Sequence, residues 1–218
     1  MKRAPVLLLA VALLVGCGGE RTHGTATLWV TRDRGAHVLL VKQVPAGETA
    51  MQALDRVTTL KTRYGGRFVQ GIDGVEGSLA EGRDWFYFVN GIAPAVGAAE
   101  FRIHPGDVEW WDYRSWKGSG EVAVVVGAFP EPFVHGFRGK VRPAVVIGAG
   151  AKELARLLHA RVATTGPRGA NVFRIVAGPP HFTARMRPGG GVEFAFAGDV
   201  RALARDPAEY RYRYEVRP

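Results

Sequence analysis

The first half of the chain shows mainly strand-like patterns of apolar and polar residues. Apolar residues dominate 26–30 and 38–44, and the charged segment Arg32-Asp33-Arg34-Gly35 between them predicts a β-hairpin. Asn90-Gly91 and Pro105-Gly106-Asp107 are typical of turns, and they separate further apolar runs. The pattern therefore predicts three more strands, at residues 68–72, 85–89 and 108–113.

One helix is predicted between these strands. Thr49 is followed three residues later by Gln52, the spacing of a capping box, in which each side chain satisfies a free backbone donor of the other. Apolar residues then recur at helical spacing as far as Leu60, and Gly65-Gly66 provides a stop signal. The order strand, strand, helix, strands predicts a β-grasp-like sheet packed on one helix.

The second half has the pattern of a mixed α/β unit. Ala151 to Val162 shows the periodicity of an amphipathic helix, and Asp199 is the expected N-cap of a short helix through Leu203. Apolar runs or alternation predict strands at residues 122–126, 144–147, 172–176, 192–196 and 210–216. The predicted fold class is therefore α+β, with the β-grasp-like domain followed by a mixed α/β domain.

The N-terminus carries an export signal. Lys2 and Arg3 precede an apolar run, Val6 to Val15, which has signal-peptide length and is too short to span a bilayer comfortably. The run ends in Leu14-Val15-Gly16-Cys17, which resembles the lipobox of bacterial lipoproteins. We therefore expect residues 1–17 to be a signal peptide with a lipobox ending at a lipidated Cys17. The alternative is a plain secretory signal that contains a cysteine.

Cysteine usage supports the same interpretation. Cys17 is the only cysteine in the chain, so an intrachain disulfide is excluded, whereas lipidation gives the thiol a use. The expected location is extracytoplasmic, with the body of the protein held to a membrane by its lipid anchor.

Positive charge is concentrated in the second half. Residues 18–120 carry 12 basic and 12 acidic side chains, whereas residues 121–218 carry 15 basic and 8 acidic ones. Lys117-Gly118-Ser119-Gly120 has the composition of a junction, so a domain boundary is predicted there. The basic half favours attraction to anionic lipid or wall polymer. Nucleic acid is not expected as a partner of an exported protein.

Four motifs in the first half carry a family resemblance. They are Gly47-Glu48-Thr49, Gly71-Ile72-Asp73-Gly74, Trp85 to Gly91, and Pro105 to Trp110. In this order they resemble the DUF4430 family, which is related to the C-terminal domain of transcobalamin and intrinsic factor. The resemblance covers residues 25–116, whereas residues 121–218, the predicted basic α/β domain, resemble no known family.

The resemblance implies a small β-rich domain that, in the vitamin carriers, helps to enclose cobalamin. The 218 residues do not include the long α-helical barrel domain that forms the other half of that site in the carriers. A corrinoid, with cobalamin as the reference case, is therefore a candidate ligand but does not follow automatically.

Aromatic residues suggest where a ligand would bind. Trp110 and Trp111 are adjacent in a predicted strand, so they point to opposite faces, and one of them needs a cover from the second domain or from a ligand. A face that carries Trp111 and Tyr113, with Trp116 beyond, would suit stacking on a flat ring or a sugar. The predicted ligand-binding residues are Trp85, Tyr87, Asn90, Trp111 and Tyr113.

The sequence offers few residues for catalysis, metal binding or dinucleotide binding. Glu131 and His135 lie in a proline-stiffened loop and are the candidate acid/base pair, but no nucleophile is evident nearby, so a non-enzymatic protein is expected. His104 and Asp107 lack a third ligand at metal-site spacing, so no metal is predicted. Gly148-Ala149-Gly150 lacks the rest of the dinucleotide fingerprint and is interpreted as a strand-to-helix turn.

Two functional hypotheses follow. The first is a cell-surface, lipid-anchored binding protein that takes a small molecule, such as a corrinoid, on an aromatic sheet face beside a cleft between the domains. The second is a structural or interaction protein of the envelope, attracted to anionic wall polymer, lipid or an envelope protein through residues 121–218. The second hypothesis predicts salt-sensitive binding and no concave aromatic site.

Overall fold

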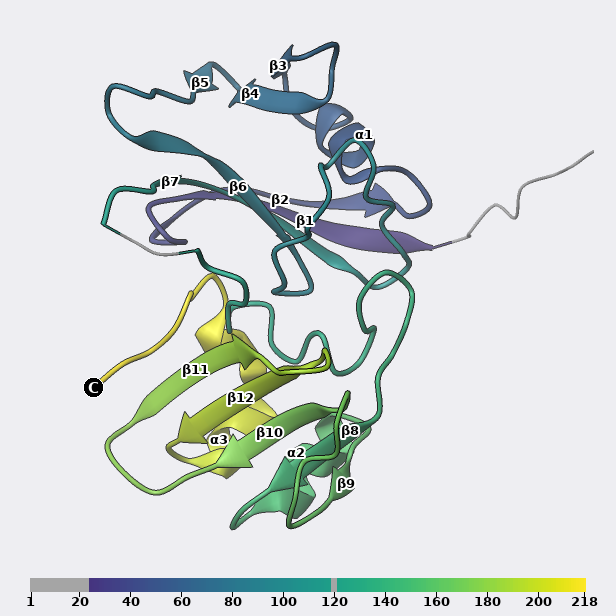
Figure 1. The fold of residues 1–218 in the computed structure, drawn as a ribbon, viewed down its shortest axis with the longest axis vertical. Helices are drawn as coiled ribbons and strands as arrows, with labels where there is room; N and C mark the ends of the chain where they lie inside the picture. Colours follow the sequence, from purple (N-terminus) through teal and green to yellow (C-terminus); the bar gives the residue numbers. More distant parts are fainter. Residues whose placement is uncertain (1–23, 119–120) are drawn as a thin grey trace, which may run out of the picture.

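The computed structural model describes residues 24–118 and 121–218, which form two sheet-based units stacked along the long axis of the molecule (Figure 1). The predicted signal peptide with Cys17 lies outside the described residues, as do Ser119 and Gly120 of the predicted junction. In the part of the chain that the structure describes, no helix combines the length and the apolar character needed to cross a bilayer.

The first unit is built on a four-stranded sheet in the order β2-β1-β7-β6. β1 (Thr25–Arg32) and β2 (His37–Pro45) form the predicted hairpin, and β6 (Arg83–Val89) pairs antiparallel with β7 (Val108–Ser115). β1 and β7 run parallel in the centre of the sheet. This is the arrangement expected of a β-grasp-like sheet.

One helix, α1 (Ala50–Asp55), packs on this sheet. The predicted capping box is present, because the Gln52 N–H donates to Thr49 Oγ1 at 3.2 Å and the Thr49 N–H donates to Gln52 Oε1 at 3.0 Å. The predicted extent of the helix is wrong. It ends at Asp55, and Leu60 already belongs to the next strand.

The early end of α1 has a local cause. Thr58 still donates to the Leu54 carbonyl oxygen, through its N–H at 3.1 Å and its hydroxyl at 2.8 Å, but the Thr59 N–H donates to Asp73 Oδ1 at 2.7 Å instead of to a helix carbonyl. The chain then enters a separate small sheet of β3 (Leu60–Arg63), β4 (Phe68–Ile72) and β5 (Val75–Glu76). This sheet and α1 lie at the same end of the molecule (Figure 1).

The second unit is the expected mixed α/β sheet, in the order β11-β12-β10-β8-β9. The strands predicted at 144–147, 172–176 and 192–196 are present and run parallel to one another, together with a short strand that was not predicted. A second strand that was not predicted, β11, pairs antiparallel at the edge. The bounds are β8 (Ala144–Ile147), β9 (Arg161–Val162), β10 (Asn171–Ile175), β11 (His181–Met186) and β12 (Val192–Ala197).

Two short helices cover this sheet on one face. α3 (Val200–Arg205) has the predicted N-cap, since Asp199 Oδ1 accepts from the Arg201 and Ala202 N–H groups. α2 (Ala151–Leu157) is shorter than predicted, because His159 adopts a φ of 49° and Val162 lies in β9. A 3₁₀ helix, η1 (Pro207–Tyr210), follows α3.

Two predicted strands, at 122–126 and 210–216, are wrong. The first segment bonds to several partners in turn, with the Val125 N–H donating to Gly91 O and the Val126 N–H donating to Tyr214 O. In the second segment Tyr212 has a φ of 63°, which breaks an extended strand. Both segments supply apolar side chains that cover the first unit, which explains why their sequences resemble buried strands.

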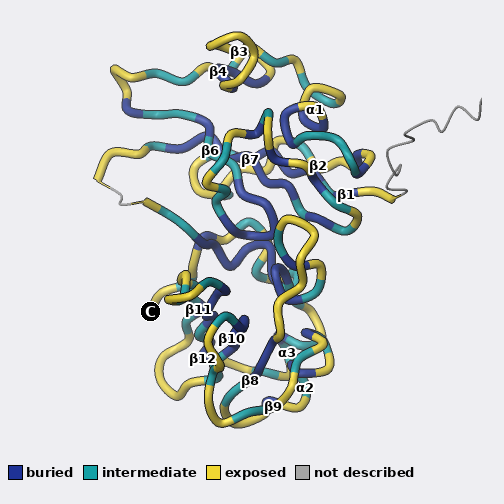
Figure 2. The backbone as a smooth tube through the Cα atoms, turned by 45° about the vertical axis from the view of Figure 1, so that its right-hand side comes forward, coloured by how far each residue is buried: buried dark blue, intermediate teal, exposed yellow. Residues whose placement is uncertain are grey.

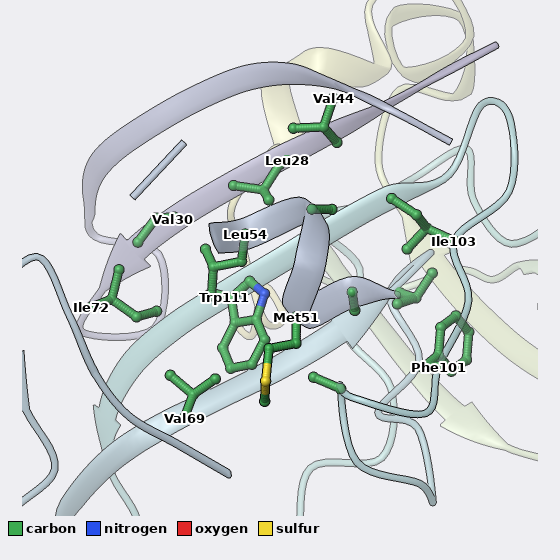
Figure 3. Packing of buried hydrophobic residues seen from close by; sticks show 14 of the residues in the cluster. Leu28, Val30, Val44, Met51, Leu54, Val69, Ile72, Phe101, Ile103 and Trp111 are labelled. Carbon is green, nitrogen blue, oxygen red and sulfur yellow. The ribbon is translucent and has the colours of Figure 1, made fainter. Parts of the chain in front are cut away.

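The core consists of three clusters of buried side chains, and the buried backbone follows the strands of both units (Figure 2). One cluster fills the space between α1 and the first sheet (Figure 3), and one lies under α2 and α3. The third lies on the opposite face of the first sheet, where Trp29, Phe88 and Trp110 meet Val125 and Tyr214. The predicted α+β class is thereby confirmed.

Candidate functional site

Three of the predicted ligand-binding residues, Trp85, Trp111 and Tyr113, lie on the face of the first sheet that α1 covers. They are only 6%, 3% and 5% exposed. Figure 3 shows Trp111 beneath α1, close to Met51 and Leu54. The helix and the small sheet fill the space above this face, whereas the second unit covers the opposite face that carries Trp110.

The polar edges of these rings are also occupied. Trp85 Nε1 donates to the Val75 carbonyl oxygen at 2.9 Å, and the Tyr113 hydroxyl donates to the Glu76 carbonyl oxygen at 3.0 Å. Trp111 Nε1 donates to Glu109 Oε1 at 2.6 Å. A buried indole N–H or phenol O–H needs such a partner, so the small sheet is held against this face by hydrogen bonds as well as by apolar contact.

Asn90 forms the predicted turn with Gly91, since both residues have positive φ, at 51° and 75°. Its side chain is fully buried. Nδ2 donates to Asp107 Oδ1 and to the Gly136 carbonyl oxygen, each at 2.7 Å, and Oδ1 accepts from the Val108 N–H at 2.8 Å. The amide therefore ties the turn to the loop at Gly136, and its hydrogen-bonding groups are taken within the protein.

Asp107 lies at the centre of a titratable cluster between the two units. Its Oδ2 accepts from the His104 N–H at 2.7 Å, and the ring of His135 lies against Gly106, where an added Cβ would lie 2.3 Å from His135 Cδ2. Burial raises the pKa of Asp107, and hydrogen bonds from His104 and Asn90 oppose that effect. No group of three or more metal-ligating side chains comes together within residues 24–118 and 121–218.

Glu131 and His135, the candidate acid/base pair, do converge. Glu131 Oε1 lies 2.6 Å from His135 Nδ1, and Oε2 accepts from the His135 N–H at 2.8 Å. Burial raises the pKa of Glu131, and the bonds from His135 oppose that effect. Both carboxylate oxygens are thus engaged in closing the loop 131–135, which is a structural use for this pair.

A groove of about 490 Å³ runs beside β6, the edge strand of the first sheet. Two of the predicted residues, Trp85 and Tyr87, line it, whereas Asn90, Trp111 and Tyr113 do not. Phe68 and Trp116 are 38% and 41% exposed, and together with Phe86 they give the groove an aromatic character. Its remaining lining residues are Asp84, Ala93, Pro94, Arg114, Glu121 and Val122.

Side-chain contacts along β6 shape this groove. Asp84 Oδ1 accepts from the Trp85 N–H at 2.8 Å, and burial raises the pKa of the Asp84 carboxyl. Tyr87 stacks on Trp111 with ring centroids 5.0 Å apart, and its hydroxyl donates to the Val96 carbonyl oxygen. Burial also raises the pKa of Tyr87, so this hydroxyl stays protonated as a donor.

Arg114 is the unexpected member of the groove. It is 4% exposed, and its guanidinium lies 3.8 Å from the centroid of the Phe86 ring. Arg114 Nη1 donates to the Ser115 carbonyl oxygen at 3.3 Å, but its Nε has no hydrogen-bond partner, and no carboxylate among the described residues lies within ion-pair distance. A buried arginine normally has an acidic partner. Because Arg114 has none among the described residues, the wall of the groove holds an uncompensated positive charge.

The sequence contained a signal for Arg114 that was not used. Side chains alternate along a strand, so Arg114 shares a face with Trp110 and Asp112 of β7. Trp110 is fully buried and that face is covered, so a cation at this register stands where an apolar residue is expected. Such a local conflict between pattern and residue is typical of functional positions.

Comparison with known proteins finds one family model that matches part of the first unit. A model described as "Domain of unknown function (DUF4430)" matches residues 47–115. The match lies within residues 25–116, where the four sequence motifs predicted a resemblance to this family. No curated protein matches the chain in sequence.

Two solved structures match part of this chain. A proposed metal binding protein from Ruminococcus gnavus is 12% identical over 43% of this chain and 98% of that chain, with a TM-score of 0.36. Haptocorrin in complex with Cbi is 13% identical over 45% of this chain, with a TM-score of 0.37. The alignment spans about a quarter of the haptocorrin chain, 26% of its length.

Proposed function

We propose that this protein is a non-enzymatic binding protein, lipid-anchored outside the cytoplasm, whose groove beside β6 holds a small molecule with a flat ring and an anionic group. The observation that carries the proposal is Arg114, a buried guanidinium without an ion pair among the described residues, in the wall of an aromatic groove. A ligand anion would supply the missing partner.

The groove has the composition of a ligand site. At about 490 Å³ it falls within the usual range of roughly 300–1,000 Å³ for small-molecule pockets. Phe68 and Trp116 expose ring surface on which a flat molecule can stack, and Phe86 is already stacked under Arg114. Shape and apolar contact would come from the rings, and orientation from the cation.

A corrinoid is the finer candidate that the DUF4430 resemblance suggests. A corrinoid is a flat macrocycle, and an open groove would contact one edge or face of it rather than enclose it. The ligand would then lie beside Trp85 and Tyr87 at the edge of β6, not on the buried face of Trp111 and Tyr113.

Calorimetric titration with cobalamin and with cobinamide tests this site. The protein is a chain that begins at Gly18, which keeps every described residue. Trp116→Ala removes an exposed ring from the groove, and Leu79→Ala, an exposed apolar residue outside it, is the matched control. Saturable binding that only Trp116→Ala weakens would support the corrinoid. If neither compound gives heat, the corrinoid is excluded, and binding that both variants weaken equally would exclude the groove.

The lipid anchor needs its own test. The full chain and its Cys17→Ser variant would be expressed with labelled palmitate, and membranes would then be separated from soluble material. We expect label and membrane association in the full chain, and loss of both in the variant, because Cys17 is the only thiol available. Label that persists in the variant would contradict lipidation at Cys17.

A second function, adhesion to an anionic polymer or lipid surface, is favoured by the open face of the second sheet. There three arginines, Arg174, Arg185 and Arg187, surround the single carboxylate of Glu193. Only Arg185 is largely exposed, but the three arginines outnumber the one carboxylate, and such an excess of positive charge attracts polyanions at long range in a way that salt screens. Association with anionic wall fragments should therefore weaken steeply as sodium chloride is added, and salt-insensitive association would contradict this function.

A further inference from the structure

A second cavity, distinct from the groove beside β6, lies where the two units meet. We call it the cationic cleft. It has a volume of about 290 Å³ and a floor formed by Ile92, Pro132 and Phe137. Ile92 comes from the turn after β6, whereas Pro132 and Phe137 come from the loop that precedes β8. The cleft therefore depends on the contact between the units.

Three cations form the rim of the cleft, Arg138, Lys140 and Arg142. All three are exposed, and no carboxylate lines the cleft. In residues 24–118 and 121–218, none of the three forms an ion pair. Their charges therefore reinforce one another over an apolar floor, and the low polarity of that floor reduces screening.

The backbone that carries the first cation is held in an unusual conformation. Phe137 and Lys140 pair across a two-residue turn, in which Arg138 and Gly139 have φ values of 55° and 69°. The left-handed region is unfavourable for arginine, and asparagine or glycine is the usual residue in such a turn. A strained position that keeps a long cation is a reason to look for a function there.

The third cation is positioned by a close backbone approach. Arg142 Nη1 donates to the Gly169 carbonyl oxygen at 3.1 Å, and its Nη2 lies 2.8 Å from where a Cβ at Gly190 would stand. Gly190 also has a φ of 87°, so a side chain is disfavoured there for two reasons. The glycine turn thus lets the guanidinium lie flat against the wall of the cleft.

We infer that the cationic cleft is a second ligand site, which binds a small organic anion with an apolar body. A carboxylate or phosphate would meet Arg138, Lys140 and Arg142, and the apolar body would cover Ile92 and Phe137. This inference does not depend on the groove beside β6, because the two cavities share no lining residue.

Two fluorescent probes of nearly the same shape test the inference. Anilinonaphthalene sulfonate has an aromatic body and an anionic group, whereas phenylnaphthylamine has the same body without the charge. The protein is again the chain that begins at Gly18. The variants are Arg138→Asn, which suits the left-handed turn, and Arg142→Gln. Arg161→Gln, an exposed arginine of β9 outside the cleft, is the matched control.

We expect saturable binding of the sulfonate, about tenfold weaker in Arg138→Asn and in Arg142→Gln and unchanged in Arg161→Gln. Binding of the neutral probe should change little in all variants. Equal weakening by Arg161→Gln would reduce the effect to general surface charge and overturn the inference. So would the absence of saturable sulfonate binding by a folded wild-type protein.

A vesicle assay separates a free anion from a membrane headgroup. Flotation with phosphatidylglycerol vesicles should be insensitive to Arg138→Asn and Arg142→Gln if the cleft takes a free molecule. Loss of flotation in both variants, without sulfonate binding by the wild type, would assign the cations to a lipid surface and overturn the inference. Because the sulfonate also has the flat ring and the anionic group proposed for the groove beside β6, each titration is repeated in the Trp116→Ala background. The weakening by Arg138→Asn and Arg142→Gln should persist there, so that failure of the groove and failure of the cleft are distinguishable.

Discussion

The two faces of the first sheet are buried by different means. The face that carries Trp111 is covered by α1 and the small sheet, which lie between β2 and β6 in the sequence. The face that carries Trp110 is covered by segments from beyond residue 120, including Tyr214 near the C-terminus. One face is thus covered by residues close to it in the sequence. The other face is covered by residues about a hundred positions away, as in the contact between Asp112 and Tyr214.

Each face also holds one buried carboxyl group of β7, and the two are satisfied differently. On the second face Asp112 accepts from the Thr31 hydroxyl at 2.6 Å, the Tyr214 hydroxyl at 2.9 Å, and the Arg34 and Gly35 N–H groups. On the α1 face Glu109 accepts one bond, from Trp111, and its Oε2 has no partner. The hairpin of the first unit therefore satisfies most of Asp112, and the distant cover adds the Tyr214 hydroxyl as a polar anchor, whereas the local cover leaves the Glu109 carboxyl with one partner.

The largest expected effect comes from removing a ring from either face. Trp110→Ala and Trp111→Ala should each lower the free energy of unfolding by about 3–5 kcal/mol, because both side chains are almost fully buried. Only Trp110→Ala should also raise hydrogen exchange at residues 212–216, since Trp110 contacts Tyr212 and Tyr214 directly. Equal exchange in the two variants would show that the C-terminal segment is held elsewhere.

Removing a single hydroxyl tests the anchor itself. Tyr214→Phe leaves the ring in place but removes one donor to the buried Asp112, so it should lower the free energy of unfolding by about 1–3 kcal/mol. The matched control is Tyr212→Phe, whose hydroxyl bonds to no carboxylate among the described residues. Urea unfolding of the two variants measures the difference, and equal midpoints would contradict the anchoring role of Tyr214.

The same contrast explains what the sequence could predict. The hairpin, the capping box at Thr49 and the cap at Asp199 depend on neighbouring residues, and all are present, as are the predicted strands at 85–89, 108–113, 144–147, 172–176 and 192–196. The predicted strands at 122–126 and 210–216 depend on distant partners. The continuous apolar run 122–126 and the alternating run 210–216 do place Val125 and Tyr214 in the core, but one sequence pattern cannot distinguish strand pairing from packing across a sheet.

The candidate site divides in the same way. Strand geometry alone predicts that Trp110 and Trp111 point to opposite faces of the sheet. The structure confirms this, with Trp111 in the core beneath α1 and Trp110 in the core on the other face. The sequence could not show that Trp111 and Tyr113 are covered while Phe68 and Trp116 remain exposed, because the covering residues come from other elements. Arg114 was missed because a charged residue in a strand is ordinarily assigned to the solvent face.

The buried carboxyl of Glu109 makes the α1 face sensitive to pH. Burial raises its pKa well above the ordinary value of 4.5, so the folded protein holds a proton that the unfolded chain has already lost. The unfolded state therefore binds fewer protons in this range, and stability falls as pH rises from 4.5 towards the folded pKa. The slope is about 1.4 kcal/mol per pH unit.

Glu109→Gln isolates this effect, because glutamine cannot ionise. The stability of the wild type relative to the variant, measured by urea unfolding, should decline as the pH rises above the ordinary glutamate pKa of 4.5. The exposed Glu100→Gln is the control and should follow the wild type. A constant difference between wild type and Glu109→Gln across this range would show that Glu109 is ionised in the folded protein throughout.

The smallest expected effect concerns the helix that closes the α1 face. Thr49→Ala removes the capping hydroxyl of α1 and should lower the free energy of unfolding by about 1 kcal/mol. A helix of six residues has little stability of its own, so the loss should appear as faster hydrogen exchange at Ala50–Asp55 and over Trp111, with residues 212–216 unchanged. If exchange increased equally at 212–216, the two faces would open together, and the separation between local and distant cover would be wrong.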